Sequence, residues 1–186
     1  MKPLIVGIGG SPRTGSTCEL ALLLALRAAE EAGARTLVFN GAFLANLPMY
    51  APEDTARTQE QRQLVETVRQ ADGLIVASPG YHGGISGSIK NALDLLEDLR
   101  GDRRCYLDGR AVGCIIAAGG WQTVGVALTA LRSIVHALRG WPTPLGAGIN
   151  TSENIFDLTG HCTDQAAAMQ LTTVGRQVVE FANKWR

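Results

Sequence analysis

The sequence has no excess of either charge, because its 17 lysines and arginines are matched by 17 aspartates and glutamates. Proteins that bind nucleic acids or anionic membrane surfaces usually carry more basic than acidic residues, so this balance favours neither as a partner. It also argues against a highly acidic electron carrier that docks on basic proteins. No apolar run approaches the length of a membrane span, and the first strand-like run begins so close to Met1 that no signal peptide is expected.

Paired cysteines and the common catalytic motifs are absent as well. The four cysteines are scattered without a C-x-x-C pair, which favours a reduced cytoplasmic protein with free thiols. There is no G-x-S-x-G nucleophile elbow and no H-E-x-x-H zinc helix, and the three histidines are too dispersed for a metal cluster. We therefore expect neither a metal site nor a hydrolytic nucleophile.

What the sequence does contain is an alternation of short apolar runs and longer helical segments. Its 186 residues suit a single domain, 1–186, without linker, repeat or low-complexity segment. Strands are expected at 4–8, 36–39, 73–77, 111–117 and, weakened by two glycines, 142–149. Helices are expected at 18–32, 58–71, 85–99, 124–138 and 164–185, whereas the segment 40–54, with two prolines, is expected to be irregular.

Buried strands that alternate with helices predict an α/β fold in which helices cover both faces of a parallel sheet. With right-handed crossovers and five strands, we expect a flavodoxin-like three-layer sandwich with a five-stranded parallel sheet in the order 2-1-3-4-5. Ligands of such sheets bind beyond the carboxyl ends of the strands, at the switch point between the first and third. Three unusual segments fall at that edge: the first loop (11–17), the second loop (78–84) and the third loop (118–121).

The first loop lies between the first strand and the first helix, where free backbone N–H groups and the helix dipole favour an anion. It resembles a P-loop, but Ser16 stands where the phosphate-binding lysine belongs, so a nucleoside triphosphatase is not expected. Pro12 replaces the third glycine of a dinucleotide fingerprint. A hydroxyl-rich loop with one guanidinium suits a terminal phosphomonoester such as that of FMN, and an ordinary helix N-cap is the alternative. The hydroxyls of this loop and the guanidinium of Arg13 are the candidate donors to the phosphate.

The second and third loops are rich in glycine, which lets the backbone approach a flat ligand closely. Backbone donors near the ring of a flavin stabilise its reduced form, and Tyr81 is placed to stack on or border the ring. A solvated Tyr81–His82 pair is the competing interpretation. No side chain here needs to act as a general acid or base, because hydride chemistry belongs to the cofactor.

Four motifs resemble those of the NAD(P)H-dependent FMN reductases of flavodoxin-like fold, a family that includes quinone, azo-dye and chromate reductases. They are G-S-P-R-x-x-S-T (10–17), S-P-x-Y-x-x-x-I-x-G-x-x-K-N-x-x-D (78–94), A-G-G (118–120) and L-P-x-Y (47–50). The motif at 78–94 is the most specific, and the resemblance covers most of the chain.

The resemblance implies FMN as cofactor, NADPH or NADH as co-substrate and a small-molecule electron acceptor, in a homodimer or homotetramer. It implies that the FMN phosphate is held by Ser11, Arg13, Ser16 and Thr17, with the backbone N–H of Cys18. The ring would be flanked by Pro79, Gly80, Tyr81, His82 and Gly83, with weaker contacts from Ala118, Gly119 and Gly120. Lys90, Asn91 and Asp94 would brace the second loop and its helix rather than touch the ligand.

Some positions depart from the family pattern. His82 and Gly80 stand where Glu or Asn is frequent, and Asn46 replaces an acidic residue before the 47–50 motif. Three arginines at 100, 103 and 104 are candidates for a ribose phosphate, although a solvated loop is the better interpretation.

Two further functions stay open: an electron carrier of flavodoxin type, and a regulatory α/β domain whose loops bind only sulfate-like anions. The acceptor and the nicotinamide preference stay open too.

Overall fold

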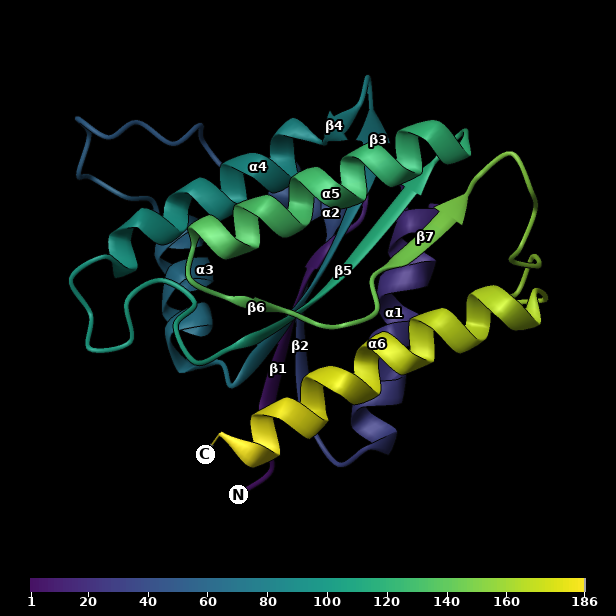
Figure 1. Ribbon diagram of the computed structural model, residues 1–186. Helices are drawn as coiled ribbons and strands as arrows, with labels where there is room; N and C mark the ends of the chain where they lie inside the picture. Colours follow the sequence, from purple (N-terminus) through teal and green to yellow (C-terminus); the bar gives the residue numbers. More distant parts are fainter. Residues whose placement is uncertain (186) are drawn as a thin grey trace.

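The computed structural model describes residues 1–185 and arranges them as a sheet between two layers of helices (Figure 1). The elements along the chain are β1 (Leu4–Gly9), α1 (Thr17–Glu31), β2 (Arg35–Phe39), α2 (Gly41–Ala45), α3 (Gln59–Gln70), β3 (Gly73–Tyr81), β4 (Gly84–Ile85), α4 (Gly87–Asp94), the 3₁₀ helix η1 (Leu95–Leu99), β5 (Ala111–Ala118), α5 (Trp121–Ala137), β6 (Trp141–Pro142), β7 (Ala147–Asn150) and α6 (Gln165–Lys184). Among these described helices, none is both long and apolar enough to cross a membrane.

The parallel strands follow the order β2-β1-β3-β5-β6, and β7 continues the outer position beside β5. The predicted flavodoxin-like order is therefore confirmed, but its fifth strand consists of two short pieces instead of one run over 142–149. Thr143 still donates its N–H to Val112, whereas Pro144 has no N–H and Leu145 donates its N–H to the side chain of Gln177. The chain therefore leaves β5 at Pro144 and rejoins it at Ala147.

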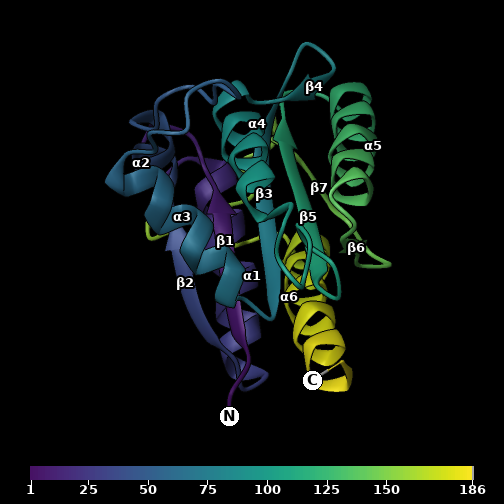
Figure 2. The same ribbon diagram turned by 90° about the vertical axis from the view of Figure 1, so that its left-hand side faces the viewer.

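The strands of the sheet centre are apolar without interruption because both of their faces are covered. Alternate residues such as Ile5, Ile75 and Ile115 pack with α1 and α6. Their neighbours Val6, Val76 and Ile116 belong to a second cluster, with α2, α3, α4 and α5. In Figure 2, α3 and α4 cross in front of β1 and β3, on the face opposite α1.

Two segments that were expected to be irregular are ordered, and both flank the carboxyl edge of the sheet. Residues 41–45 form α2, because Asn40 accepts the N–H of Phe43 as an N-cap and both prolines of the segment lie beyond the helix. In the second loop, β3 continues to Tyr81 and pairs antiparallel with β4. His82 (φ 49°) and Gly83 (φ 82°) have the left-handed conformations of a type I′ hairpin turn. The expectation of irregular structure was wrong for residues 41–45 and for the hairpin, whereas residues 46–54 form neither helix nor strand, as expected.

At the opposite, amino edge of the sheet, the buried side chain of Arg110 connects three segments. It is 1% exposed and donates to the carbonyls of Arg69 (2.7 Å), Ala71 (2.9 Å) and Tyr106 (2.9 Å). Two of these carbonyls lie at the end of α3, where a cation also complements the helix dipole. Burial lowers the pKa of Arg110 to about 10, so the guanidinium stays charged at neutral pH.

We expect Arg110→Met to lower the free energy of unfolding by about 2–4 kcal/mol, because three buried carbonyls lose their donor while the aliphatic volume is kept. Urea unfolding monitored by circular dichroism measures the change. Arg103→Met is the control, since Arg103 is exposed and its loss is expected to change stability by less than about 0.5 kcal/mol. Equal stabilities for the two variants would contradict the role assigned to Arg110.

Candidate functional site

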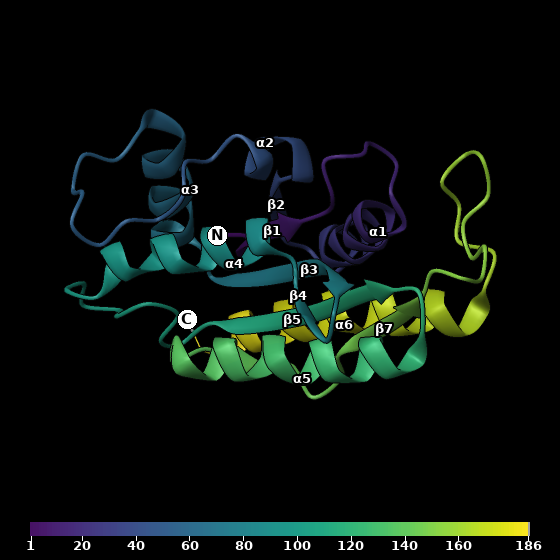
Figure 3. The same ribbon diagram turned by 90° about the horizontal axis from the view of Figure 1, so that it is seen from above.

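The carboxyl ends of β1, β3, β5 and β7 surround a cavity of about 330 Å³. Its walls are the three loops identified in the sequence and a fourth loop (151–154) after β7. The residues that line it are Ser11, Arg13, Ser16, Thr17, Cys18, Pro79, Gly80, Tyr81, Ala117, Ala118, Gly119, Thr151 and Asn154. Segments separated by more than a hundred residues thus meet at one edge of the sheet (Figure 3).

All but three of the predicted site residues line this cavity. The exceptions are His82 and Gly83, which form the turn of the β3–β4 hairpin, and Gly120, the N-cap of α5. The structure thus brings the predicted phosphate residues and the predicted ring residues to the same cavity. The segment 47–50 is not among the lining residues.

Ala117, Thr151 and Asn154 line the cavity but were not predicted. The fourth loop is ordered, since Thr151 donates its N–H to Ala118 (2.8 Å) and the side chain of Asn150 accepts from both the N–H and the hydroxyl of Ser152. A polar run directly after a parallel strand is the signal that points to this loop. The sequence does not predict this loop as part of the site, because the pattern of the fifth strand before it is interrupted by glycines.

The first loop has the geometry of an anion site. Ser16 is the N-cap of α1 and accepts the N–H of Glu19, so the N–H groups of Thr17 and Cys18 are left without a partner inside the helix. Arg13 is the cation of the cavity lining, and within residues 1–185 its guanidinium forms no hydrogen bond or ion pair. Unpaired donors and one unpaired cation favour a phosphate or a similar anion here.

Gly41, at the start of α2, supports the first loop from outside the cavity. A Cβ atom at this position would overlap the backbone of Ser11. The loop is also held at its start, where Gly10, with φ 102°, donates its N–H to Ala77 of the neighbouring strand. The conformation of the first loop is therefore set by close backbone contacts with β3 and α2.

The second loop is positioned by hydrogen bonds from buried side chains. Ser78 is buried, and its hydroxyl accepts the N–H of Ser86 (2.9 Å), which ties β3 to the segment after the hairpin. Gly80 faces the third loop so closely that a Cβ atom would lie 2.9 Å from that of Ala118. Tyr81 is 56% exposed at the mouth of the cavity. Backbone, rather than side chains, therefore forms this wall.

Asn91 ties α4 to the segment 48–50 rather than to the second loop. Its side chain accepts the N–H of Tyr50 (2.7 Å) and donates to the carbonyl of Pro48 (3.0 Å). Lys90 and Asp94 form an ion pair on the surface of α4, so they too stabilise the helix rather than line the cavity.

Cys18 lies in the first turn of α1 and lines the cavity, yet its thiol is not activated. Burial raises the pKa of Cys18 to about 12, which outweighs a hydrogen bond from the backbone of Gly10. The side chain is therefore a neutral thiol at physiological pH and packs as a small apolar group.

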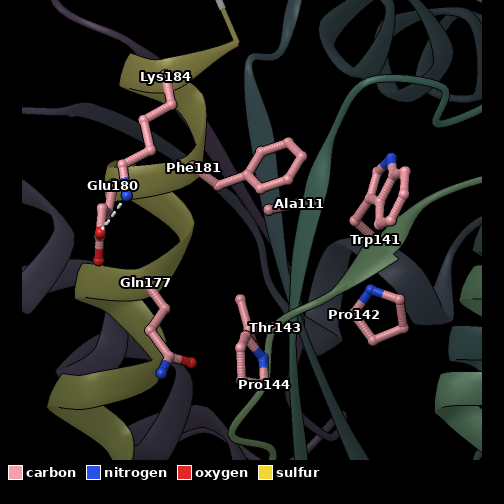
Figure 4. Close-up of a pocket in the computed structure, with 9 residues that line it drawn as sticks. All are labelled: Ala111, Trp141, Pro142, Thr143, Pro144, Gln177, Glu180, Phe181 and Lys184. Atoms are coloured by element: carbon pink, nitrogen blue, oxygen red, sulfur yellow. Dashed lines mark hydrogen bonds and ion pairs between the residues drawn. The ribbon is translucent and has the colours of Figure 1, made fainter.

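Two cavities at the amino edge of the sheet are separate from this site. Arg103 and Arg104 line one of them together with Trp185, so they cannot bind a ligand that occupies the first loop at the other edge. The second is an apolar groove between β6 and α6, with Trp141 and Phe181 in its walls (Figure 4).

Within residues 1–185 no group of three or more His, Cys, Asp or Glu side chains is arranged to hold a metal ion.

Sequence comparison relates the chain to flavoproteins. The family model described as NADPH-dependent FMN reductase matches residues 3–153. The chain is 32% identical over 152 residues to an FMN reductase (NADPH) of Pseudomonas putida, covering 81% of this chain and 72% of that protein. It is 30% identical over 151 residues to an iron-sulfur flavoprotein of Archaeoglobus fulgidus, covering 78% and 76%. For an FMN-dependent NADPH-azoreductase of Staphylococcus aureus, 32% identity extends over 67% of this chain and 64% of the relative.

Solved structures agree with this fold. The NAD(P)H:(acceptor) oxidoreductase FerB of Paracoccus denitrificans superimposes with a TM-score of 0.78 at 19% identity over 98% of both chains. A flavodoxin, WrbA-like protein of Agrobacterium tumefaciens gives a TM-score of 0.67 at 14% identity over the full length of both chains. At these identities the superpositions establish the flavodoxin-like fold.

The four cysteines are free, and their burial predicts very different reactivities. We expect Cys18 and Cys114, both buried and each with a pKa raised to about 12, to resist a thiol reagent at pH 8 in the folded protein. Cys105, which is partly exposed, is expected to react first. Timed labelling followed by peptide mass spectrometry measures the order, and all four thiols should react in urea. Fast labelling of Cys18 in the folded state would contradict the buried, neutral thiol.

Proposed function

The chain belongs to the NADPH-dependent FMN reductase family, and on that basis we propose that its carboxyl-edge cavity binds FMN for NAD(P)H-dependent electron transfer to a small-molecule acceptor. The observation that carries the proposal is the shape of one cavity. It joins an anion-binding first loop to a backbone-walled cleft between the second and third loops. A phosphate and a flat ring on one ligand match that pair of features.

The donors of the first loop fit a phosphomonoester. Arg13 has a free guanidinium for a charge-assisted contact, and the hydroxyls of Ser11 and Thr17 lie in the same lining. Ser16 is already engaged as the N-cap, so its part is to hold the turn whose first N–H groups stay free. Together, the guanidinium, the hydroxyls and the free N–H groups suit an anionic phosphate better than a neutral ligand.

The opposite part of the cavity fits a flat ring. Pro79, Gly80 and Gly119 offer little or no side-chain bulk, and a Cβ atom at Gly119 would meet nothing. FMN, when bound, supplies the chemistry of accepting a hydride and releasing electrons. The chain orients the ring with backbone groups at the ends of β3 and β5, while Tyr81 borders the entrance.

The rim of the cavity supports a role for a second copy of the chain, in a homodimer or homotetramer. Tyr81 lines the cavity and is 56% exposed, and Val126 of α5, also exposed, lies beside the hairpin turn at Gly83. Apolar side chains gathered at a ligand entrance are suited to burial between subunits.

The four free cysteines support a reducing compartment such as the cytoplasm.

The first test is turnover. FMN-loaded protein is expected to oxidise NADPH or NADH in stopped-flow experiments, with bleaching of the flavin absorbance, and to be reoxidised by free flavin, a quinone or an azo dye in a ping-pong pattern. A protein that binds FMN but oxidises neither nicotinamide is instead an electron carrier of flavodoxin type. Absence of FMN binding would overturn the proposal and favour an anion-binding regulatory domain.

The second test concerns Arg13. We expect Arg13→Ala to weaken FMN binding about 10- to 100-fold, since one charge-assisted contact to the phosphate is lost. Riboflavin, which lacks the phosphate, should bind equally well to both forms. Arg103→Ala is the matched control, because it removes an arginine from the amino edge. Fluorescence titration gives the dissociation constants of FMN and riboflavin for the wild type and both variants, and an unchanged FMN affinity of Arg13→Ala would show that the phosphate lies elsewhere.

A further inference from the structure

Glu19 interacts with the first loop from the first turn of α1. Its carboxylate accepts the N–H of Gly15 at 2.7 Å, and Gly15 has a left-handed backbone with φ 69°. The side chain thus reaches back four residues and closes the loop on the helix that follows it. This resembles a capping box, except that the N–H it binds belongs to the residue before the N-cap.

The charge of Glu19 is not neutralised by a neighbouring cation. Within residues 1–185 its carboxylate has the Gly15 N–H as a partner and no ion pair with lysine or arginine. Arg13, two residues before Gly15, also stays unpaired. The unpaired guanidinium of Arg13 therefore lines the cavity, whereas the carboxylate of Glu19, in α1, does not line the cavity.

These two properties of Glu19 act on a bound phosphate in opposite directions. As an acceptor, the carboxylate fixes the backbone at Gly15 and so keeps the loop in shape before any ligand arrives. As a negative charge at the start of α1, it opposes the helix dipole field that attracts an anion. Repulsion between a carboxylate and a phosphate dianion about one helical turn apart is worth about tenfold in affinity in partly solvated surroundings.

We propose that Glu19 is a positioning residue that shapes the first loop and at the same time keeps FMN exchangeable. The inference rests on the proposed function, because it concerns the phosphate of a ligand in the same cavity. Glu19 acts through Gly15 and through its field, without touching the ligand. The affinity for FMN would therefore be lower, and its dissociation faster, than expected from the hydrogen-bond donors of the first loop alone.

The decisive variant is Glu19→Gln, which keeps an oxygen acceptor for Gly15 and removes the charge. We expect it to bind FMN about tenfold more tightly at low ionic strength, with a smaller gain in 0.5 M salt (about a 4 Å screening length). Riboflavin affinity should not change. Glu31→Gln, at the other end of α1 and fully on the surface, is the control and should leave both affinities unchanged.

Glu19→Ala separates the two effects, because it removes the acceptor as well as the charge. We expect its FMN affinity to fall below that of Glu19→Gln. Thermal melting of each apo-variant identifies any general loss of folding. Equal FMN affinities for the wild type and Glu19→Gln, or an equal change for riboflavin, would overturn the inference while leaving FMN binding intact. A wild-type protein that binds no FMN would overturn the proposed function, and the inference with it.

Discussion

The pairing of β1 with β3 is the constraint on which the rest of the molecule depends. Ile8 and Gly9 lie beside Val76 and Ala77, so the first and second loops begin at the same level of the sheet. The chain leaves β1 toward α1 on one face of the sheet and leaves β3, by way of β4, toward α4 on the other face. The loops diverge at this switch point, and a crevice is left between them. The residues of the first and second loops are placed by this divergence, and the ends of β5 and β7 add the third and fourth loops.

The fold was predictable because the central strands are apolar on both faces, a pattern that leaves little choice of architecture. The site was predictable where residue type alone carries the signal, as in the hydroxyls of the first loop and the glycines of the second and third. The β3–β4 hairpin was missed because Pro79 and the glycines read as a loop, although backbone pairing with β4 and β5 keeps this segment extended. The role of Arg110 could not be predicted, since two of its partners lie about forty residues away in sequence. The fourth loop was missed because the strand before it is weak in the sequence.

The relatives carry different names, from FMN reductase to azoreductase and iron-sulfur flavoprotein. The structure suggests a physical basis for such variety. The backbone of the inner cavity is fixed by strand ends and by Gly41, whereas the side chain of Tyr81 at its mouth is exposed. In the function proposed above, the strand ends would hold the cofactor while an exposed side chain such as Tyr81 would meet the acceptor.

The divided outer strand has a consequence for self-association. Pro142 lies in β6 and Pro144 follows it, so this border of the sheet offers few N–H groups to an incoming strand. The opposite border, β2, has no such interruption and exposes Leu37 and Val38. The two borders are therefore unequal templates for strand addition. Two partly unfolded molecules that associate through their sheet edges would therefore pair through β2. A fibril, which needs strand pairing at both borders of each sheet, is disfavoured.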